Sequence, residues 1–424
     1  MRVNLHDFSG HPFQVQLARN LASRGHEVLH QYSSQYETGH GRLRITADDP
    51  GTLRIEALTA AVPLVKYSPL GRARFEMAYA RAWRGRLDRE RFDVIIACNV
   101  PLFALARMRR YFARSNQPWV LWHQDVYSMG VAAEADRRLP RPLAALVRQR
   151  VERTERAQVT AADAVVAIGE PFLEQYARWS VSRDNVHVIP NWAPLNELLP
   201  GDRDNPWARR HDIPDGPIRL MYAGTLGRKH NSGLLLELLD AVRSEGLDAM
   251  LIVVSEGVGA DDLALAASGR GDVRILGYQP AEDLSDVLAT GDVMIALLEP
   301  DAAKFSVPSK VLSYLSAGRP IVALVPEGNP CAADVLAAGG YVAAPSREGA
   351  RQAGQWLSSA VGAGRDALVA LGIRSRNLAD FQFDLDRIGS QFEAILAKAT
   401  RPDSQQRRSQ VLAANPGGTE GKDL

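Results

Sequence analysis

Short runs of apolar residues recur along most of the chain, and stretches with the helical spacing of apolar positions separate them. In the first half this pattern predicts strands over residues 2–5, 27–31, 53–58, 93–98, 119–122, 164–168 and 186–189, with helices notably over 13–23, 72–89 and 142–161. A second series predicts strands over 219–222, 250–254, 273–276, 293–297 and 321–324. Strands that alternate with helices form parallel sheets, so we expect an α/β protein with two doubly wound domains.

A polar stretch with five prolines, residues 191–217, separates the two series. We expect it to link an N-terminal domain over 1–190 to a C-terminal domain over 218–380. Residues 401–424 are rich in Gln, Arg, Ser, Gly and Lys, so we expect a disordered tail there. Open α/β sheets bind ligands at the carboxyl ends of their strands, so the site is expected in a cleft between the domains.

Composition narrows the classes of partner and compartment. Among 424 residues, 50 Lys and Arg against 49 Asp and Glu give a net charge of +1, which argues against a nucleic-acid partner. The basic excess lies before residue 191, where we count 27 basic and 19 acidic residues. Cys98 and Cys331 are too far apart in sequence to suggest a disulfide framework or a C-x-x-C pair. With no secretory signal and no run of about 18 apolar residues, we expect a cytoplasmic protein whose membrane contact is at most peripheral.

Two groups of residues in the first half stand where chemistry is expected. Ser9, Gly10 and His11 form a glycine turn between a strand and a helix, where backbone N–H groups can bind an anion. A plain strand-to-helix turn is the alternative. His123 and Asp125 end another strand, and His123 has the chemistry to hydrogen-bond a sugar or to act as acid or base. A purely structural histidine is the alternative there.

The second half offers a loop suited to a diphosphate. Gly224 and Gly227 allow the backbone to approach a ligand closely, while Arg228 and Lys229 add positive charge for a leaving group. Two solvated loop cations are the alternative.

Further along the chain, a loop and a helix repeat this arrangement. Pro308 suits a first helical turn and Gly318 a helix end. Local capping explains neither Ser309 nor Lys310, which we expect to face the ligand.

In this order and spacing, these segments resemble the family-4 retaining glycosyltransferases with the GT-B fold, especially the bacterial enzymes of O-antigen, capsule and exopolysaccharide synthesis. The likeness rests on Ser9-Gly10 followed by R-G-H-E-V, the pair His123 and Asp125, the segment Ile189-Pro190-Asn191, the loop with Gly224, Gly227, Arg228 and Lys229, the segment V-R-I-L-G-Y that ends at Tyr278, and the motif P-S-K-V-L-S-Y-L-S-A-G-R-P-I-V-A that begins at Pro308.

The resemblance implies two Rossmann-like domains, the first for the acceptor and the second for a nucleotide diphosphosugar, with a helix over 381–400 that crosses back to the first. It implies transfer of a hexosyl or N-acetylhexosaminyl group with retention, UDP being the favoured carrier. The implied catalytic residues are Arg228, Lys229, His123 and Asp125; the implied donor-binding residues are Gly224, Gly227, Tyr278, Pro308, Ser309, Lys310 and Ser313; the implied acceptor or phosphate loop is Ser9, Gly10 and His11.

No cofactor and no metal are implied. No D-x-D motif stands where it would hold a metal for the diphosphate, and Arg228 with Lys229 can supply that charge. With no evident carboxylate nucleophile, front-face attack assisted by the leaving phosphate is the mechanism that the resemblance favours.

The chain departs from the family pattern at two glutamates, replaced here by Phe305 and Ser313, and Gln124 splits the His-Asp pair. A catalytically degenerate protein that binds nucleotide or assembly partners is therefore the alternative to the enzyme. A nucleotide-sugar epimerase shares only the fold. A Rossmann dehydrogenase is disfavoured, because the first glycine turn is not G-x-G-x-x-G.

Two basic segments suggest contact with an anionic bilayer. Residues 66–91 carry eight cations against three acids, with aromatic residues between them, and residues 102–114 combine four arginines with apolar residues. An ordinary amphipathic helix with a buried apolar side is the alternative for each. In the acceptor domain of a glycosyltransferase, these segments favour a polyprenyl-diphosphate-linked glycan on the inner face of the plasma membrane as acceptor.

Overall fold

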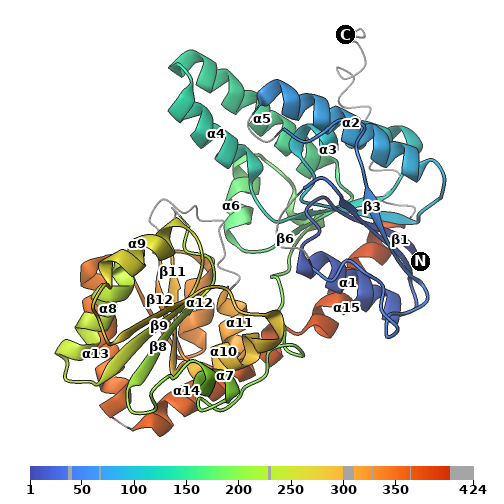
Figure 1. Cartoon of the computed structure of the whole chain (residues 1–424). Coiled ribbons are helices and arrows are strands. Elements are labelled where there is room, and N and C mark those ends of the chain that lie inside the picture. The colour runs from blue at the N-terminus through green and yellow to red at the C-terminus, as the bar shows by residue number, and fades with distance from the viewer. Residues whose placement is uncertain are drawn as a thin grey trace. The chain divides into compact units, whose positions relative to one another are not determined.

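The computed structural model describes residues 1–36, 41–65, 68–227, 231–298, 310–326, 328–362 and 364–401. The chain forms two compact units, Met1–Asn191 together with Leu385–Leu424, and Trp192–Asp384. Each unit is an α/β domain built on one parallel sheet (Figure 1). The tail predicted over 401–424 lies, except for its first residue, outside the described residues.

The sheet of the first unit has the strand order β3-β2-β1-β4-β5-β6-β7. Its strands are β1 (Arg2–Asp7), β2 (Glu27–Ser33), β3 (Leu53–Leu58), β4 (Val94–Cys98), β5 (Trp119–His123), β6 (Ala164–Ala167) and β7 (Val186–Val188). Its helices are α1 (Pro12–Ser23), α2 (Pro69–Leu87), α3 (Leu102–Ser115), α4 (Tyr127–Arg138), α5 (Arg141–Ala161), α6 (Pro171–Arg178) and α15 (Leu385–Ala399). The order reverses between β1 and β4, so a crevice for a ligand is expected at their carboxyl ends.

The sheet of the second unit has the order β10-β9-β8-β11-β12-β13 and reverses between β8 and β11. Its strands are β8 (Ile218–Ala223), β9 (Ala249–Val254), β10 (Val273–Leu276), β11 (Val293–Leu297), β12 (Ile321–Leu324) and β13 (Tyr341–Ala343). Its helices are α7 (Pro206–Arg210), α8 (Gly233–Ser244), α9 (Val258–Ala266), α10 (Leu284–Thr290), α11 (Lys310–Ser316), α12 (Pro330–Ala337), α13 (Arg347–Gly362) and α14 (Arg365–Gln382).

The central strands of both sheets are continuous apolar runs because helices cover both of their faces. All residues of β4 (V-I-I-A-C) and β9 (A-M-L-I-V-V) are buried. Such runs are typical of parallel sheets, whose strands bury side chains in both directions. The two glycine-containing loops start from β1 and β8, whose residues are also buried, with the exception of Arg2.

The stretch 191–217 differs from the featureless linker that its prolines suggest. From Trp192 onward it belongs to the second unit. It contains the short helix α7, in which Pro206 takes the first turn and the side chain of Asn205 accepts a hydrogen bond from Ala208 N–H at 2.9 Å. Proline is compatible with the first turn of a helix, because N–H groups in that turn have no partner within the helix and the N–H that proline lacks is therefore not needed.

Helix α15 folds with the first unit, although the second unit separates the two in sequence. It packs on α1, where Asn20 Nδ2 donates to Asp386 Oδ1 at 2.6 Å. A side chain at Gly389 would collide with Asn20, so glycine permits this close approach. Phe392 meets the ring of Trp122 on β5 edge-on, with centroids 4.9 Å apart.

The aromatic residues of α2 form the core of the first unit and do not face a membrane. Phe75, Tyr79 and Trp83 are fully buried. On the polar side of α2, Arg86 binds the Glu56 carboxylate at 2.7 Å. In the described part of residues 66–91, the aromatic side chains therefore lie as the alternative predicts, on the buried side of an ordinary helix. No helix in the described part of the chain is long and apolar enough to cross a membrane.

Candidate active site

A cavity of about 220 Å³ lies at the carboxyl ends of the central strands of the first unit. The predicted residues that line it are Ser9, His11, His123 and Asp125. Arg72 and Asn99 line it as well, although the sequence analysis did not name them as site residues. The structure thus brings the β1–α1 loop and the end of β5 to one edge of the sheet, on either side of β4, as expected for the carboxyl ends of parallel strands.

The β1–α1 loop is organised by the buried carboxylate of Asp7. This carboxylate accepts hydrogen bonds from the N–H groups of Ser9 at 3.2 Å and His11 at 2.7 Å. It also accepts one from Asn99 Nδ2 at 2.8 Å. Gly10 N–H donates to the Asp7 carbonyl, and Gly10 adopts a left-handed φ of 68°. The predicted anion site made of free N–H groups is therefore wrong in this detail, since Asp7 takes up these donors.

Burial raises the pKa of Asp7 to about 6, although the Asn99 side chain and the loop N–H groups lower it. A carboxyl group with this pKa changes its charge near neutral pH, where its protonation would weaken the hydrogen bonds that hold the loop.

His123 lies within a buried hydrogen-bond chain and is not a free acid or base. Its Nδ1 is 2.7 Å from the Tyr176 hydroxyl, and its Nε2 is 3.2 Å from Glu155 Oε1. Burial raises the pKa of Tyr176, so the phenol keeps its proton. The Glu155 carboxylate can only accept, so Nε2–H is the donor of the bond to it. The histidine is thereby fixed in orientation, and its ring lines the cavity.

Glu155 joins His123 to the first turn of α4. Its two carboxylate oxygens accept the N–H groups of Tyr127 at 2.7 Å and Ser128 at 2.9 Å. Burial alone would raise its pKa, but hydrogen bonding and attraction from His123, together with bonds from Ser128, lower the net value. Glu155 is therefore a buried, charged carboxylate. No sequence signal marks Glu155 as a site residue, because it lies in a stretch rich in arginine and glutamate that resembles a solvated helix face.

The two residues after His123 have different roles. The side-chain amide of Gln124 forms a pair of hydrogen bonds with that of Asn191, at 3.0 and 3.1 Å. This pair ties the end of β5 to the segment Ile189-Pro190-Asn191. Asp125 is exposed and lines the cavity, so of the His-Asp pair it is Asp125 whose side chain reaches solvent.

Arg72 supplies a cation to the same cavity. Its guanidinium carbon lies 5.6 Å from the centre of the Tyr127 ring, and its Nε donates to Glu76 at 3.0 Å. Glu76 is buried and also accepts the N–H of Phe103 at the start of α3, at 2.9 Å. Arg72 is therefore held by a carboxylate that is itself fixed. Its position on the first turn of α2, facing the cavity, could not be predicted without the helix orientation.

In the second unit, Gly224 and Lys310 meet at the carboxyl end of β8. Gly224 has a left-handed φ of 134°, and a side chain there would lie 3.3 Å from Lys310 Nζ and Cε. The Lys310 ammonium donates to the Tyr222 hydroxyl and lies 4.0 Å from the centre of that ring. Burial lowers the pKa of Lys310 to about 7. An anion beside Lys310 would favour the charged form of its amine, and the attraction between the two charges would strengthen the binding of the anion.

Tyr314 fixes the backbone beside this lysine. Its buried hydroxyl donates to the Ala223 carbonyl at 2.9 Å and accepts the Ala223 N–H at 3.1 Å. Ser313, the preceding residue on α11, is half-buried. Tyr222 and Tyr314 could not be recognised as site residues from the sequence, because tyrosines in a strand and a helix are usually core residues.

The remaining predicted donor residues lie on neighbouring loops. The Tyr278 hydroxyl is hydrogen-bonded to Thr225 Oγ1, its N–H donates to Glu256 Oε1 at 3.2 Å, and its side chain is half exposed. Gly227 ends the described part of the β8 loop and is half-buried. The other residues named for this site, Phe305, Pro308, Ser309, Arg228 and Lys229, lie outside the described residues.

Two protein-family models match this chain. A "Glycosyl transferase 4-like domain" matches residues 11–192, and "Glycosyl transferases group 1" matches residues 217–357. A curated relative is WcaI of Escherichia coli (strain K12), whose name describes a colanic acid biosynthesis glycosyl transferase. The two chains are 27% identical over 235 residues, which cover 53% of this chain and 56% of WcaI. The chain thus matches about half the length of this curated relative.

Solved structures share the fold across nearly the whole chain. Sucrose-phosphate synthase from Thermosynechococcus elongatus is 16% identical with a TM-score of 0.69, covering 98% of this chain and 100% of that one. Anabaena Alr3699/HepE in complex with UDP is 14% identical with a TM-score of 0.68, covering 94% and 100%. These likenesses show the fold, which is GT-B. With both family models matched in succession along its two domains, the chain belongs to the family-4 glycosyltransferases.

Proposed function

We propose that the protein is a retaining glycosyltransferase that moves a sugar from a nucleotide diphosphosugar to a growing surface glycan. The observation that carries this proposal is the half-buried Lys310 beside Gly224 at the carboxyl end of β8. The Lys310 ammonium is partly shielded from water, and Gly224 beside it has no side chain to cover the backbone. A diphosphate could therefore approach both groups closely with its oxygen atoms. The membership of a glycosyltransferase family supports the same reading.

In the proposed reaction the bond between the anomeric carbon and the diphosphate breaks, and a bond from the acceptor hydroxyl oxygen forms on the same face. The acceptor proton passes to an oxygen of the leaving diphosphate. Lys310, together with Arg228 and Lys229, stabilises the negative charge that grows on that group, so we propose that no metal is required. A UDP-hexose or UDP-N-acetylhexosamine is the proposed donor, which the UDP complex of HepE supports.

The cavity of the first unit is the proposed acceptor site. Arg72, Asp125 and Asn99 line it with a cation, an exposed carboxylate and a side-chain amide. Such mixed polar groups suit sugar hydroxyls. We propose a lipid-linked glycan of the cell envelope as acceptor, on the cytoplasmic face of the membrane. The name of WcaI, which refers to colanic acid biosynthesis, supports a polysaccharide product.

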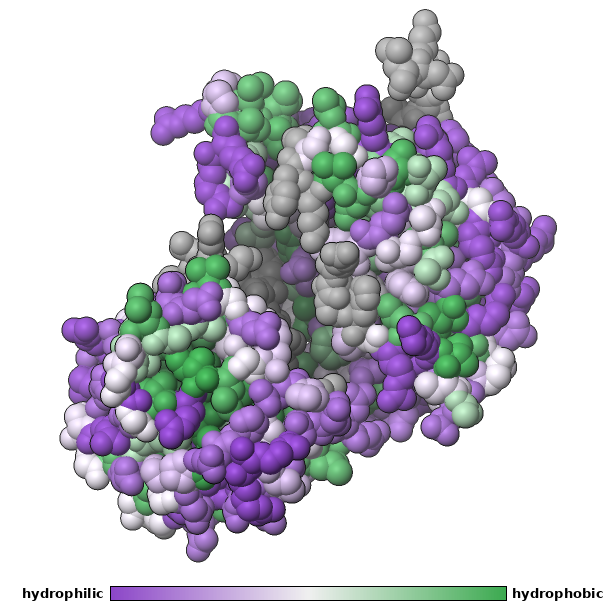
Figure 2. Space-filling view, viewed as in Figure 1, coloured by the Kyte–Doolittle hydropathy of each residue, from purple (hydrophilic) through white to green (hydrophobic). Residues whose placement is uncertain are grey.

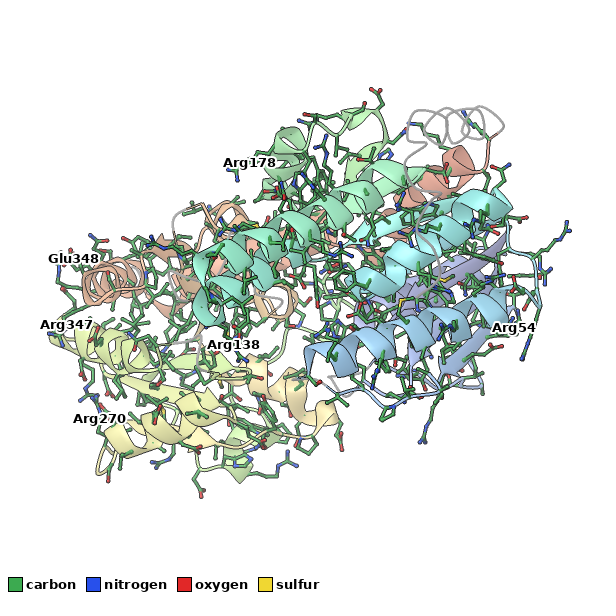
Figure 3. The ribbon with its side chains drawn as sticks, turned by 90° about the horizontal axis from the view of Figure 1, so that it is seen from above. Arg54, Arg138, Arg178, Arg270, Arg347 and Glu348 are labelled. Atoms are coloured by element: carbon green, nitrogen blue, oxygen red, sulfur yellow. The ribbon has the colours of Figure 1, made fainter. Side chains whose placement is uncertain are left out.

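Thermal-shift binding of UDP, GDP, ADP and their sugar conjugates tests the donor site. One base family is expected to stabilise the wild type by about 2.7 kcal/mol at a hundredfold excess over Kd. Lys310→Met and the pair Arg228→Ala with Lys229→Ala are expected to abolish most of this shift. The control pair Arg347→Ala with Arg351→Ala removes the same charge from exposed positions on α13 (Figure 3 labels Arg347) and should leave it unchanged.

A degenerate nucleotide-binding protein is the second candidate, because the half-buried Ser313 stands where the family carries a glutamate. A neutral hydroxyl can hydrogen-bond a ribose but supplies no charge. Transfer or hydrolysis of the stabilising donor by the wild type would exclude this candidate. Binding without any turnover would favour it.

A further inference from the structure

Carboxylates of the chain itself hold backbone N–H groups at three places around the cavity of the first unit. Asp7 accepts those of the β1–α1 loop, and Glu155 accepts those of the first turn of α4. Glu76 accepts two N–H groups at the start of α3, at 2.9 and 3.3 Å. Phosphates bind to free N–H groups at the starts of helices. A phosphate in this cavity would therefore have to displace a carboxylate at each of these places.

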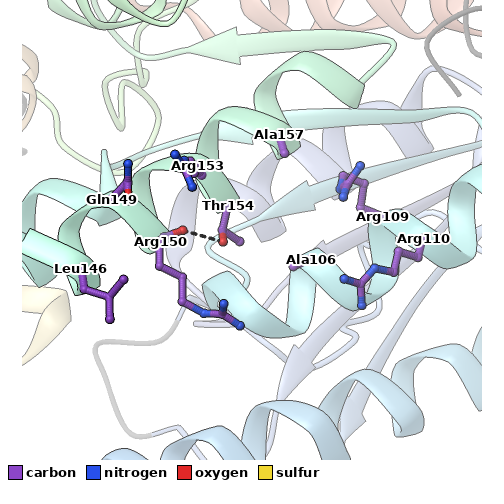
Figure 4. Close-up of a pocket in the computed structure, with 9 residues that line it drawn as sticks. All are labelled: Ala106, Arg109, Arg110, Leu146, Gln149, Arg150, Arg153, Thr154 and Ala157. Atoms are coloured by element: carbon purple, nitrogen blue, oxygen red, sulfur yellow. Dashed lines mark hydrogen bonds between the residues drawn. The ribbon is translucent and has the colours of Figure 1, made fainter. Parts of the chain in front are cut away.

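Positive charge is scarce inside the cavity. Arg72 is the only lysine or arginine among the described residues that line it. A separate groove between α3 and α5 is lined by Arg109, Arg110, Arg150 and Arg153 (Figure 4). The described linings of the groove and the cavity have no residue in common. Figure 2 shows hydrophilic side chains on the outer surface of the α4–α5 hairpin, and the arginines of α4 are exposed. A negative charge bound in the cavity therefore has Arg72 as its partner.

The end of the Arg72 side chain is fixed in place and yet open to a ligand. Its Nε donates to Glu76 Oε1 at 3.0 Å, and the Glu76 side chain is 2% exposed. Nη1 and Nη2 form no hydrogen bond or ion pair with the part of the chain that the structure describes. The Arg72 side chain is 40% exposed and lines the cavity. Its two terminal amino groups can therefore bind both oxygens of a carboxylate, the pairing that a guanidinium group favours.

The charges around Arg72 suit a ligand with one negative charge better than a ligand with two. The carboxylates of Asp125 and Glu155 line the same cavity. Like charges repel each other, so a doubly charged phosphate meets more repulsion there than a singly charged carboxylate. Ser9 and Asn99 line the cavity with a hydroxyl group and an amide, which suit the hydroxyl groups of a sugar. The cavity thus combines a place for one carboxylate with places for hydroxyl groups.

We propose that Arg72 binds the carboxylate of a hexuronic acid in the acceptor glycan. The carboxylate oxygens accept hydrogen bonds from Nη1 and Nη2 of Arg72, and the sugar hydroxyls bind the neutral polar groups of the cavity. Arg72 thereby selects acidic glycans over neutral ones with the same ring. The proposal rests on the proposed function, because it takes the cavity as the acceptor site.

Saturation-transfer NMR of the full chain, which detects weak binding of small sugars, tests this proposal. The probes are the methyl glycosides of glucuronic, galacturonic and mannuronic acid. Each acid is compared with its uronamide, which has nearly the same shape and no charge. For at least one of the three sugars we expect the acid to bind about tenfold more tightly than the uronamide, because hydrogen bonds between charged groups are stronger than those of a neutral amide.

Two substitutions of Arg72 test its role in this preference. Arg72→Gln removes the charge, so the acid and the uronamide should bind equally. Arg72→Lys keeps a charge beside Glu76 but lacks the paired N–H groups, so it should lose most of the preference. Arg150→Gln removes an exposed arginine of the α3–α5 groove in the same unit and should keep the preference. Circular dichroism melts check that each variant folds.

The proposal is wrong if the wild type binds none of the acids more tightly than its uronamide. It is also wrong if a folded Arg72 variant keeps the full preference, or if Arg150→Gln loses it. Tighter binding of methyl glucoside 6-phosphate than of any of the acids, lost in Arg72→Gln, would assign Arg72 to a phosphate instead.

These measurements need neither donor nor turnover, so their outcome is independent of the donor-binding and transfer assays. Sugar transfer without a preference for acids would overturn only this inference. A carboxylate site at Arg72 in a protein that neither binds nor consumes a nucleotide sugar would overturn only the proposed function.

Discussion

Replacing Glu155 with glutamine tests the idea that one buried carboxylate organises the wall of the first unit's cavity. The side chain is 3% exposed and accepts three hydrogen bonds, from His123 Nε2 and from the N–H groups of Tyr127 and Ser128. Glutamine has the same shape, but its NH₂ group replaces one acceptor oxygen. Whichever way the amide turns, a donor then faces a donor.

The expected cost follows from the bonds that are lost. A hydrogen bond to a charged group contributes about 1.5–3 kcal/mol, and an unsatisfied buried donor costs about 1–3 kcal/mol. The first turn of α4 also loses a negative charge at its positive end, worth about 1 kcal/mol. We therefore expect E155Q to lower the free energy of unfolding of the first unit by about 3–5 kcal/mol at pH 7. The exposed control E134Q breaks only surface ion pairs and should cost less than about 1 kcal/mol.

Urea unfolding followed by tryptophan fluorescence measures both variants, and its pH dependence identifies the cause. The folded-state pKa of Glu155 lies below its ordinary value of 4.5. Its contribution to stability is therefore fully present above pH 4.5 and is lost as pH falls through the folded-state pKa. The gap between wild type and E155Q should narrow at acidic pH. A cost below about 1 kcal/mol, or a gap that is the same at every pH, would refute this reasoning.

Three further changes test other parts of the molecule. His30 is fully buried, and both ring nitrogens lack partners among the described residues; burial, with the charge of Arg19, lowers its pKa to about 3. Below pH 6.5 this histidine therefore binds a proton in the unfolded chain but not in the folded chain. As pH falls, the free energy of unfolding decreases by up to about 1.4 kcal/mol per pH unit. His30→Leu should flatten this slope in urea titrations. Gly224→Ala should abolish nucleotide binding in calorimetry, while Gly246→Ala, with a left-handed φ in open space, should keep it. Nucleotide binding should also weaken above pH 7, because the Lys310 amine must take up a proton when the anion binds. Calorimetry in buffers of different ionisation enthalpy measures this proton uptake, which should be absent in Lys310→Met.

Most of the fold could be predicted because apolar runs in parallel sheets are long and continuous. The ranges of β3, β10, β11 and β12 agree with the predicted ones, and β9 begins one residue earlier. Strand β13 is only three residues long, too short for a pattern to emerge. Helix α4 was not predicted either, since its sequence is rich in alanine and has few large apolar residues to mark a face.

The site could be predicted only where a residue's place in the chain determines its place in the fold. His123 ends a strand and Asp125 comes just after it, so their place at the carboxyl edge of the sheet needs no further information. Their hydrogen-bond partners come from distant helices, as Tyr176 and Glu155 do for His123. No sequence pattern shows that a glutamate between arginines turns inward.

The β1–α1 loop shows the same limit from another side. A glycine turn before a helix predicts N–H groups that can receive an anion, and the sequence does contain that turn. The structure supplies the anion from the chain itself, because the Asp7 carboxylate folds back onto the loop. Which of these two arrangements occurs depends on the path of a few backbone dihedrals, which the sequence pattern does not specify.

The central claim is sugar transfer from a nucleotide diphosphosugar. NMR tests it most directly, by following the fate of the donor that stabilises the protein in the presence of lipid-linked glycan acceptors. We predict consumption of the donor, release of the nucleoside diphosphate and a product with the anomeric configuration of the donor, all lost in Arg228→Ala with Lys229→Ala. A product of inverted configuration would contradict the proposed mechanism. Tight binding of the nucleotide sugar without transfer or hydrolysis with any acceptor would contradict the claim itself.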